Sequence, residues 1–510
     1  MLDVGRIDPG PQQGVADGVT AQGGGGERAE RTAQPPKRRA CGGENDGTRL
    51  HSPRDFHRRE FHGLLPAQGS SRRPANARRQ VTVDRAARLG RIAPLVCAVA
   101  MPYGVLALIV KYQVNLPLMD EWMWADFDYH LHRGTLTLGE LWAPHNEHRI
   151  LVPNLVMIAL ARLGGWFIVR EELVGLAFFI ACQLLLWRLI SRTVVERSAP
   201  VTFFCVSALL FSLGQHMNFG YGFQLGWPLC TLSLLIVVTL LSTSTIPLRH
   251  VGFAAIAGGV GSYSSAQALL VWPLGIGLLL LARRRSVTAI TVWLAAGLVV
   301  IAIDHLGRGA PSAQTPFDVG ALLGYSLTYL GSPLAGWAGI LPAATAGFVC
   351  VAAICGHAVG DVVRRDRVTL DRRAPWYALA AYAILAAPIT GIARLDSGGG
   401  VQALSSRYIS ISSLLTIALL VLLVQDVSAS RRAIVRALAV ASIAVLTLLV
   451  VPESQSGLAY WQANAAQLET DLAEIRSGNT AAVTDIYPSM TMLEKYVRRL
   501  REIGDGPFHP

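Results

Sequence analysis

Charged residues are scarce in this chain of 510 residues, and cysteines are scarcer. Asp, Glu, Lys and Arg make up 15% of the sequence, whereas a typical soluble domain carries roughly 25%. This deficit argues against an ordinary soluble enzyme. The 7 cysteines show neither a disulfide framework nor the paired spacing of a zinc site. Six of them lie in or beside apolar stretches, where cysteine acts as a small hydrophobic residue: Cys97, Cys182, Cys205, Cys230, Cys350 and Cys355.

Residues 1–90 have no apolar periodicity and no apolar segment of the kind found in a secretory signal peptide. They are rich in Arg, Gly, Pro and Gln, with four consecutive glycines at 23–26. Such a composition cannot bury enough surface to offset the entropy lost on ordering. We therefore expect a disordered basic tail. It could touch anionic lipid or nucleic acid, but we favour a dispensable segment.

Long hydrophobic runs dominate the rest of the chain. Hydrophobic residues make up 52% of the sequence, and the mean hydropathy is +0.40. A helix needs about 20 mainly apolar residues to span a membrane. The stretches that approach this requirement are 92–111, 172–191, 199–214, 225–243, 251–265, 267–282, 287–303, 334–357, 375–393, 408–425 and 433–451. The sequence therefore predicts an all-α polytopic membrane protein with about 11 transmembrane helices in residues 91–451.

Arginines are unevenly distributed among the connections between these stretches. If the N-terminus is cytoplasmic, the arginine-rich connections all fall on the cytoplasmic side: Arg192 and Arg197, Arg249, Arg283–Arg285, Arg364 and Arg365, Arg372 and Arg373, and Arg431 and Arg432. This alternation follows the positive-inside rule. It predicts a multi-pass protein of the cytoplasmic (inner) membrane with an external C-terminus. Together with the basic residues at the N-terminus, it accounts for the net charge of +11 without a nucleic-acid partner.

The first external connection, at about 112–171, is unusually long. Its apolar part, residues 150–163, is too short to span a membrane, so we interpret it as an interfacial helix. Residues 304–333 could cover a donor site, but we prefer to interpret them as a solvated external connection. Residues 452–510 form the external C-terminal segment, where apolar residues with helical spacing predict two amphipathic helices.

Asp120 and Glu121 lie just beyond the end of the first predicted membrane helix, among aromatic residues. A carboxylate in such a place can act as a general base. The alternative is that Asp120 simply caps the short helix that follows.

Further along the same loop, Glu147, His148 and Arg149 precede the interfacial helix. An arginine there can bind phosphate through two hydrogen bonds, or it can serve only as an anchor among lipid headgroups. His145 and His148, with His130 and His132 nearby, could also hold a divalent metal, although their spacing is weak evidence for one.

The turn at 214–224 is dense in aromatic and hydrogen-bonding groups, including Gln215, His216 and Asn218. Such a set suits a sugar, whose hydroxyls need polar partners and whose faces stack on rings. It is equally consistent with an aromatic belt at the membrane interface.

The order of these features resembles GT-C-type membrane glycosyltransferases that use polyprenyl-phosphate sugars, the superfamily of protein O-mannosyltransferases and lipid A aminoarabinose transferases. Asp120-Glu121 matches the acidic motif after the first membrane helix of that family. Glu147-His148-Arg149 stands where the family has Glu-Lys-Pro-Pro, and Gln267 ends the counterpart of a Thr-Lys-Gly turn. Arg407-Tyr408 matches an Arg-Tyr pair that opens a late helix.

The resemblance implies sugar transfer from a polyprenyl-phosphate donor to a lipid, glycan or protein acceptor at the outer face of the cytoplasmic membrane. Asp120 is then the base, and Glu121 assists it. The donor phosphate is bound by residues of the two later motifs, namely Glu147, His148, Arg149, Arg407 and Tyr408. The substrate is contacted by four further polar residues, namely Gln215, His216, Asn218 and Gln267. No cofactor is required by this scheme, and a divalent metal is left open.

Two other functions are compatible with the same residues. One is an O-antigen-type polymerase or ligase, which also handles lipid-linked sugars. The other is a transporter or flippase of lipid-linked glycans. Transporters usually hold their polar sites near the membrane midplane and often contain internal repeats. No clear repeat is visible here, and the polar residues gather at the external ends of the predicted helices, which favours chemistry at the interface.

Overall fold

The computed structural model describes residues 73–146, 148–306, 318–395, 398–483 and 486–509. The predicted tail falls mainly on residues 1–72, outside this part of the chain. Its last residues, from Arg73 onward, form the first turns of helix α1 (Arg73–Tyr112). Throughout the described residues the regular structure is helical, with no strand.

Nine helical stretches of the described chain are long and apolar enough to cross a membrane. They contain α1, α5 (Ile168–Thr193), α6 (Ala199–Leu210), α8 (Gly226–Leu241), α11 (Val287–His305), α13 (Ile340–Arg364), α14 (Arg367–Arg394), α16 (Ile409–Ala429) and α17 (Ala433–Leu448). The prediction of an all-α polytopic membrane protein is thereby confirmed. The two remaining predicted crossings correspond to shorter helices, α9 (Leu248–Ser262) and α10 (Val271–Leu281).

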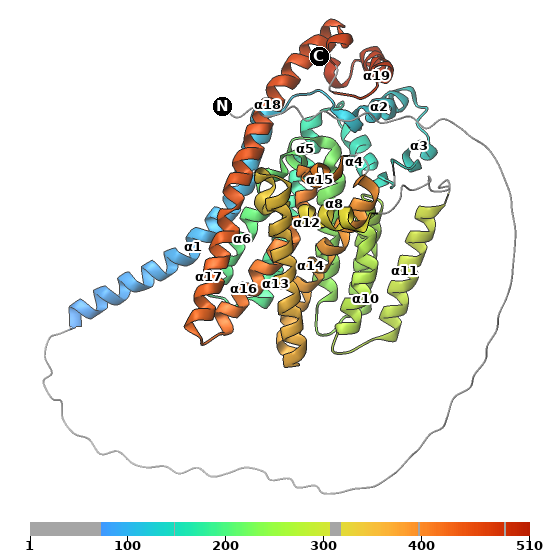
Figure 1. The fold of residues 1–510 in the computed structure, drawn as a ribbon. Helices are drawn as coiled ribbons and strands as arrows, with labels where there is room; N and C mark the ends of the chain where they lie inside the picture. The colour runs from blue at the N-terminus through green and yellow to red at the C-terminus, as the bar shows by residue number, and fades with distance from the viewer. Residues whose placement is uncertain (1–72, 147, 307–317, 396–397, 484–485, 510) are drawn as a thin grey trace, which may run out of the picture. The chain divides into compact units, whose positions relative to one another are not determined.

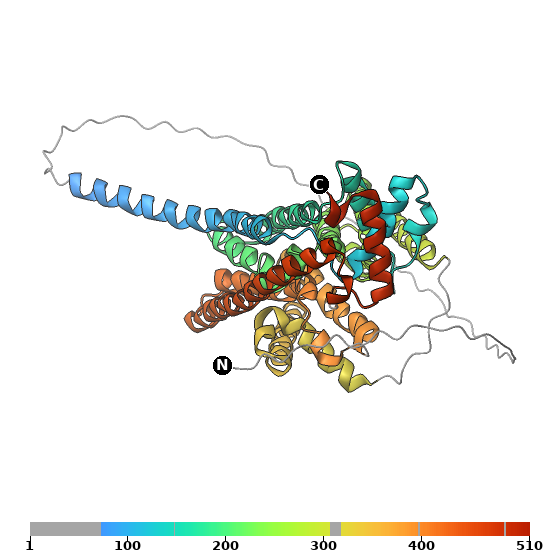
Figure 2. The same cartoon turned by 90° about the horizontal axis from the view of Figure 1, so that it is seen from above.

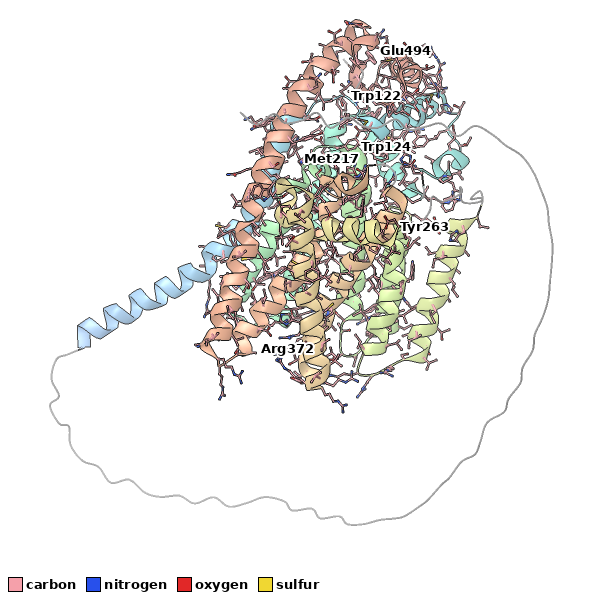
Figure 3. All side chains as sticks on the ribbon, viewed as in Figure 1. Trp122, Trp124, Met217, Tyr263, Arg372 and Glu494 are labelled. Atoms are coloured by element: carbon pink, nitrogen blue, oxygen red, sulfur yellow. The ribbon has the colours of Figure 1, made fainter. Side chains whose placement is uncertain are left out.

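The arginine-rich connections gather at one end of the helix bundle, which we call the arginine end. Arg283 forms an ion pair with Asp371 at the start of α14. The start of α14 also meets the end of α5, where Trp376 donates to the hydroxyl of Thr193 at 3.0 Å. Figure 3 labels Arg372 at this end and Trp122 at the opposite, loop end. This grouping fits the predicted alternation of charge, and the orientation in the membrane stays a prediction.

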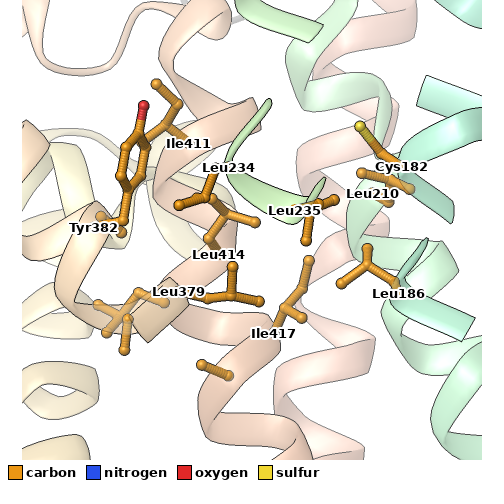
Figure 4. Packing of buried hydrophobic residues seen from close by; sticks show 14 of the residues in the cluster. Cys182, Leu186, Leu210, Leu234, Leu235, Leu379, Tyr382, Ile411, Leu414 and Ile417 are labelled. Atoms are coloured by element: carbon orange, nitrogen blue, oxygen red, sulfur yellow. The ribbon is translucent and has the colours of Figure 1, made fainter. Parts of the chain in front are cut away.

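Helix α16 is the centre of the bundle. Nearly all of its residues are buried, and Figure 4 shows Leu414 and Ile417 packed between leucines of α8 and α14. In lipid, packing of this kind holds helices together through dispersion contacts rather than through the hydrophobic effect. The start of α16 is therefore fixed in position, and it carries Arg407 and Tyr408 in a short 3₁₀ turn, η7 (Ser406–Tyr408).

Part of the region predicted as a solvated connection is a helix, α12 (Val319–Ala335). It begins beside Gly391 near the loop end of α14 and ends beside Glu453, which accepts a hydrogen bond from the backbone of Trp337. Its backbone lies very close to α13, because a Cβ atom at Gly331 would overlap the carbonyl oxygen of Ala343. A small residue at this contact is what allows the approach.

The loop end is covered by the first loop and by the C-terminal segment (Figures 1 and 2). The loop forms the 3₁₀ helix η1 (Met119–Met123), α2 (Trp124–Arg133), α3 (Leu138–Trp142) and α4 (Leu151–Arg162), and the C-terminal segment forms α18 (Val450–Ser477), α19 (Met490–Ile503) and η9 (Gly506–Phe508). A second hydrophobic core, with Trp122, Trp124 and Leu493 at its centre, joins the two segments. The two predicted C-terminal helices are thus present, and α4 has the 12 residues expected of a helix too short to span.

Candidate functional site

A cavity of about 280 Å³ lies at the loop end of the bundle. The first loop, the start of α8, the turn after α9, the end of α14 and the start of α16 all contribute to its wall. Five of the predicted site residues line it: Asp120, His148, Gln267, Arg407 and Tyr408. These residues are up to 288 positions apart in the sequence, so their meeting supports the prediction that the motifs form one site.

Asp120 reaches the cavity from η1, with 44% of its side chain exposed. Its carboxylate lies 3.5 Å from Nε2 of His145, which comes from the end of the same loop. Burial alone would raise the pKa of Asp120, but the hydrogen bond from His145 acts in the opposite direction. The positive charges of Arg407 and Arg394 lower it further, so the pKa lies below its ordinary value of 3.8. Asp120 is therefore an ionised carboxylate in an electropositive cavity.

Arg407 supplies a cation on the same cavity wall. Its Nη2 lies 3.4 Å from the hydroxyl of Tyr408, while its Nε is buried without a hydrogen-bond partner. The backbone of Arg407 is also held in place, because the side chain of Asn218 donates to the carbonyl oxygen of Arg407 at 3.1 Å. A buried guanidinium N–H without a partner is unfavourable, and an anion in the cavity would satisfy it through a charge-assisted hydrogen bond.

The remaining wall combines hydroxyls, an amide and an aromatic ring. Gln267 donates to the hydroxyl of Thr390 at 3.3 Å and accepts from Ser265. Trp227 lies edge-on to the ring of Tyr408, with 5.4 Å between the ring centroids. A wall of this composition can bind the hydroxyls and the apolar face of a sugar.

Several of these cavity residues were missed by the sequence analysis. Trp227, Thr390 and Arg394 lie at the ends of apolar helices, where nothing in the local pattern separates them from ordinary interfacial residues. The position of Arg394, four residues before the first of the glycines at 398–400, was the available signal. His145 was considered only as a metal ligand, and its contact with Asp120 is a new finding.

Glu121 does not share the cavity with Asp120, which corrects its predicted assisting role. It is 1% exposed and points to the other side of η1, towards Glu171 and Glu172 at the start of α5. Its carboxylate accepts from the backbone N–H of Leu118 at 3.2 Å. Burial raises the pKa of Glu121 to about 8, although the Leu118 hydrogen bond opposes the shift. Neighbours in a 3₁₀ helix point in different directions, which separates the two carboxylates.

Arg149 also lies outside the cavity wall, so its predicted contact with donor phosphate is wrong for this arrangement. Its guanidinium donates to the backbone carbonyls of Trp142, Asp304 and Leu306 and lies over the ring of Trp142. Its donors are occupied by the first loop and by the C-terminal end of α11, where free carbonyls attract a cation. Arg149 therefore fastens the first loop to α11.

Three predicted substrate contacts support the cavity wall from behind and do not line it. Gln215 is fully buried and donates to the carbonyl of Leu210. Asn218 holds the backbone of Arg407, as described above. The ring of His216 lies 4.5 Å from the ring of Tyr460 on α18. Their polar groups are used to position the turn, which corrects the prediction of direct sugar contact.

The predicted histidine cluster is divided among three places. His145 and His148 are at the cavity, with 6.4 Å between their ring centroids. His130 pairs with Glu140 at 2.9 Å, and His132 lies beside Asp128. The four histidines therefore do not form one metal site. Glu147 lies outside the described residues.

Comparison with known protein families finds no family that matches this chain, and comparison with curated proteins finds no similar sequence. The resemblance to GT-C-type glycosyltransferases thus rests on the sequence motifs alone.

Proposed function

We propose that the protein is a membrane glycosyltransferase that moves a sugar from a polyprenyl-phosphate donor to an acceptor hydroxyl. The observation that carries the proposal is the meeting of an ionised Asp120 and a partly unpartnered Arg407 across one cavity at the loop end of the helix bundle. A carboxylate and a cation so arranged match the two requirements of the reaction, which are a base for the acceptor and a positive charge for the leaving phosphate.

In the proposed reaction the acceptor oxygen attacks C1 of the sugar, and the bond between C1 and the phosphate oxygen breaks. The acceptor proton passes to Asp120, with His145 beside it at 3.5 Å. The bond electrons leave with the polyprenyl phosphate, whose added negative charge Arg407 stabilises. By the resemblance stated above, the transfer inverts the configuration at C1 and forms no covalent enzyme intermediate.

The low pKa of Asp120 fits this sequence of events. In the free protein the charge of Arg407 helps to hold that pKa down. A bound donor phosphate neutralises the guanidinium, so the pKa of Asp120 rises when donor is present. The carboxylate is therefore a stronger base in the complex than in the free protein. Because the pKa of Asp120 rises only when donor is bound, efficient proton abstraction is limited to the complex with the donor.

Sugar transfer in reconstituted membranes tests the proposal. With a radiolabelled polyprenyl-phosphate sugar, Asp120→Asn should reduce turnover by about 10²–10⁴-fold, because a positioned base contributes that much, and should leave donor binding largely intact. Glu140→Gln is the matched control, since this carboxylate lies in the same loop away from the cavity. Full activity in Asp120→Asn would remove Asp120 from the mechanism.

The competing proposal is a transporter or flippase of lipid-linked glycans. It predicts movement of intact donor across the vesicle membrane without transfer of its sugar. Assaying both products in the same vesicles separates the two functions: transfer without net movement supports the glycosyltransferase, and movement without transfer supports the flippase. A polymerase or ligase would transfer an oligosaccharide in preference to a single sugar.

A further inference from the structure

The first loop and the C-terminal end of the chain meet at two carboxylates and one imidazole. Asp128 and His132 are one turn apart on α2, and Asp505 directly precedes η9. One ligand-type atom from each side chain lies within 4.8 Å of the other two. None of the three lines the cavity, and the proposed sugar transfer uses none of them. The cluster therefore needs its own explanation.

Asp128 is the least satisfied member of the cluster. Its side chain is fully buried, and neither carboxylate oxygen has a hydrogen-bond partner in the described chain. Its contact with a basic group is Nδ1 of His132, which lies 3.4 Å from Oδ1. Burying a carboxylate without partners is strongly unfavourable. A second buried carboxylate, Asp505, lies close by. Two such groups side by side require either a shared proton or a bound cation.

Hydrogen bonds to the backbone orient the other two side chains, His132 and Asp505. Nδ1 of His132 lies 3.0 Å from the backbone oxygen of Asp128, so a proton on Nδ1 leaves the lone pair of Nε2 free. That Nε2 faces Oδ2 of Asp505 at 3.8 Å. The other oxygen of Asp505 accepts from the backbone N–H groups of Trp166 and Gly506, each at 2.8 Å. Supporting hydrogen bonds of this type are what hold metal ligands in place.

We propose that Asp128, His132 and Asp505 bind one divalent transition-metal ion, of which Zn²⁺ is the best match, and that this ion fastens the first loop to the C-terminal segment. Zn²⁺ lies about 2.0–2.2 Å from nitrogen and carboxylate ligands, so side chains whose ligand atoms lie within 4.8 Å of one another need to move closer together by about an ångström to bind one ion. An imidazole with two carboxylates favours Zn²⁺ over Mg²⁺ or Ca²⁺. The side chain of His132 is 42% exposed, which gives the ion a path from solvent.

The test uses full-length protein, purified in detergent through a tag that contains no histidine. The chain has 12 histidines, so the informative quantity is the difference in metal content between variants. Metal is measured by mass spectrometry in the wild type, Asp128→Asn and His132→Ala. The matched control is Asp126→Asn, which removes an ion pair between α2 and Lys495 of α19 at 2.6 Å. This control loosens the same interface without removing a proposed ligand.

The proposal predicts that Asp128→Asn and His132→Ala each lose one equivalent of Zn²⁺ relative to the wild type, while Asp126→Asn retains it. A chelator should lower the thermal unfolding midpoint of the wild type, and added Zn²⁺ should restore it, because an ion that binds only the folded state stabilises it. The chelator experiment needs no variant, so it remains informative if a substitution prevents folding.

Two results would overturn the proposal. One is an equal metal content in all four proteins, which places any bound ion elsewhere. The other is a wild-type midpoint that responds to neither chelator nor Zn²⁺. If that insensitivity accompanies an Asp128→Asn variant as stable as the wild type, the two carboxylates share a proton, since an asparagine amide can donate the same hydrogen bond.

Discussion

The buried carboxyl group of Glu121 gives a quantitative test of how the loop end is built. Burial raises its pKa to about 8 against an ordinary value of 4.5, in spite of the hydrogen bond from Leu118. Because the folded pKa exceeds the unfolded one, the stability that protonated Glu121 contributes is fully present below about pH 4.5. It is lost as the pH rises through about 8. Glu121→Gln keeps the acceptor for Leu118 and cannot ionise.

The size of the effect follows from the same two values. The difference between a pKa of about 8 and one of 4.5 corresponds to about 5 kcal/mol, at about 1.4 kcal/mol for each tenfold change in proton affinity. Glu171 and Glu172 share the buried space, so relaxation among the three carboxyls makes this figure a ceiling. We expect Glu121→Gln to exceed the wild type in stability by about 2 kcal/mol or more at pH 9.

The assay is thermal unfolding in detergent, followed by tryptophan fluorescence between pH 5 and pH 9. The wild-type midpoint should fall with rising pH, and the midpoint of Glu121→Gln should fall less steeply, because burial also raises the pKa values of Glu171 and Glu172, which still ionise in the variant. Glu140→Gln is the control, because the backbone N–H of Thr137 holds the pKa of this surface carboxyl below its usual range. Its substitution should lower the midpoint slightly at neutral pH and leave the alkaline fall unchanged. Parallel curves for Glu121→Gln and the wild type would refute the reasoning.

Two further predictions concern packing and topology. Gly331→Ala should destabilise the protein by about 1–3 kcal/mol, because the added methyl overlaps the backbone of α13. Gly324→Ala on the same helix has open space and should be neutral or slightly stabilising. Thermal unfolding midpoints compare the two variants, and equal effects would contradict the close packing of α12 on α13. In a cysteine-free background, single cysteines at the exposed positions Leu138 and Leu163 should react with an impermeant thiol reagent from the same side of the membrane. A single cysteine at Arg284 should react from the opposite side. Labelling of Leu138 and Leu163 from opposite sides would show that α4 crosses the membrane.

The membrane helices could be predicted from the sequence because their signal is local. A run of about 20 apolar residues and the position of the nearest arginines are both readable within one segment. Helix α12 escaped prediction because hydroxyl groups interrupt its apolar run. Those groups are satisfied inside the helix itself, since Ser326 donates to the carbonyl of Leu322 and Thr328 to that of Gly324. Such back-bonding makes a polar-looking segment compatible with a buried helix.

The site was predictable only in part, and the failures have a common cause. Asp120 and Arg407 were found because each lies near the end of a membrane helix, Asp120 soon after α1 and Arg407 just before α16. Arg149 has a similar local context, but its guanidinium is occupied by carbonyls 155 and 157 positions away. Glu121 differs from Asp120 only in the direction in which it leaves η1. Contacts between distant segments determine whether Arg149 and Glu121 reach the cavity, and such contacts cannot be predicted from the local sequence.

The central claim is that the cavity receives a lipid-linked phosphate at Arg407. The most direct test measures binding of a polyprenyl phosphate and of the matching uncharged polyprenol to the protein in nanodiscs. For the wild type and for Arg372→Gln, a control at the arginine end, the phosphate should bind about 10–100-fold more tightly than the alcohol, as expected of a charge-assisted hydrogen bond. Arg407→Gln should lose most of this preference, and Arg407→Lys should recover part of it. An undiminished preference for phosphate in Arg407→Gln would contradict the account.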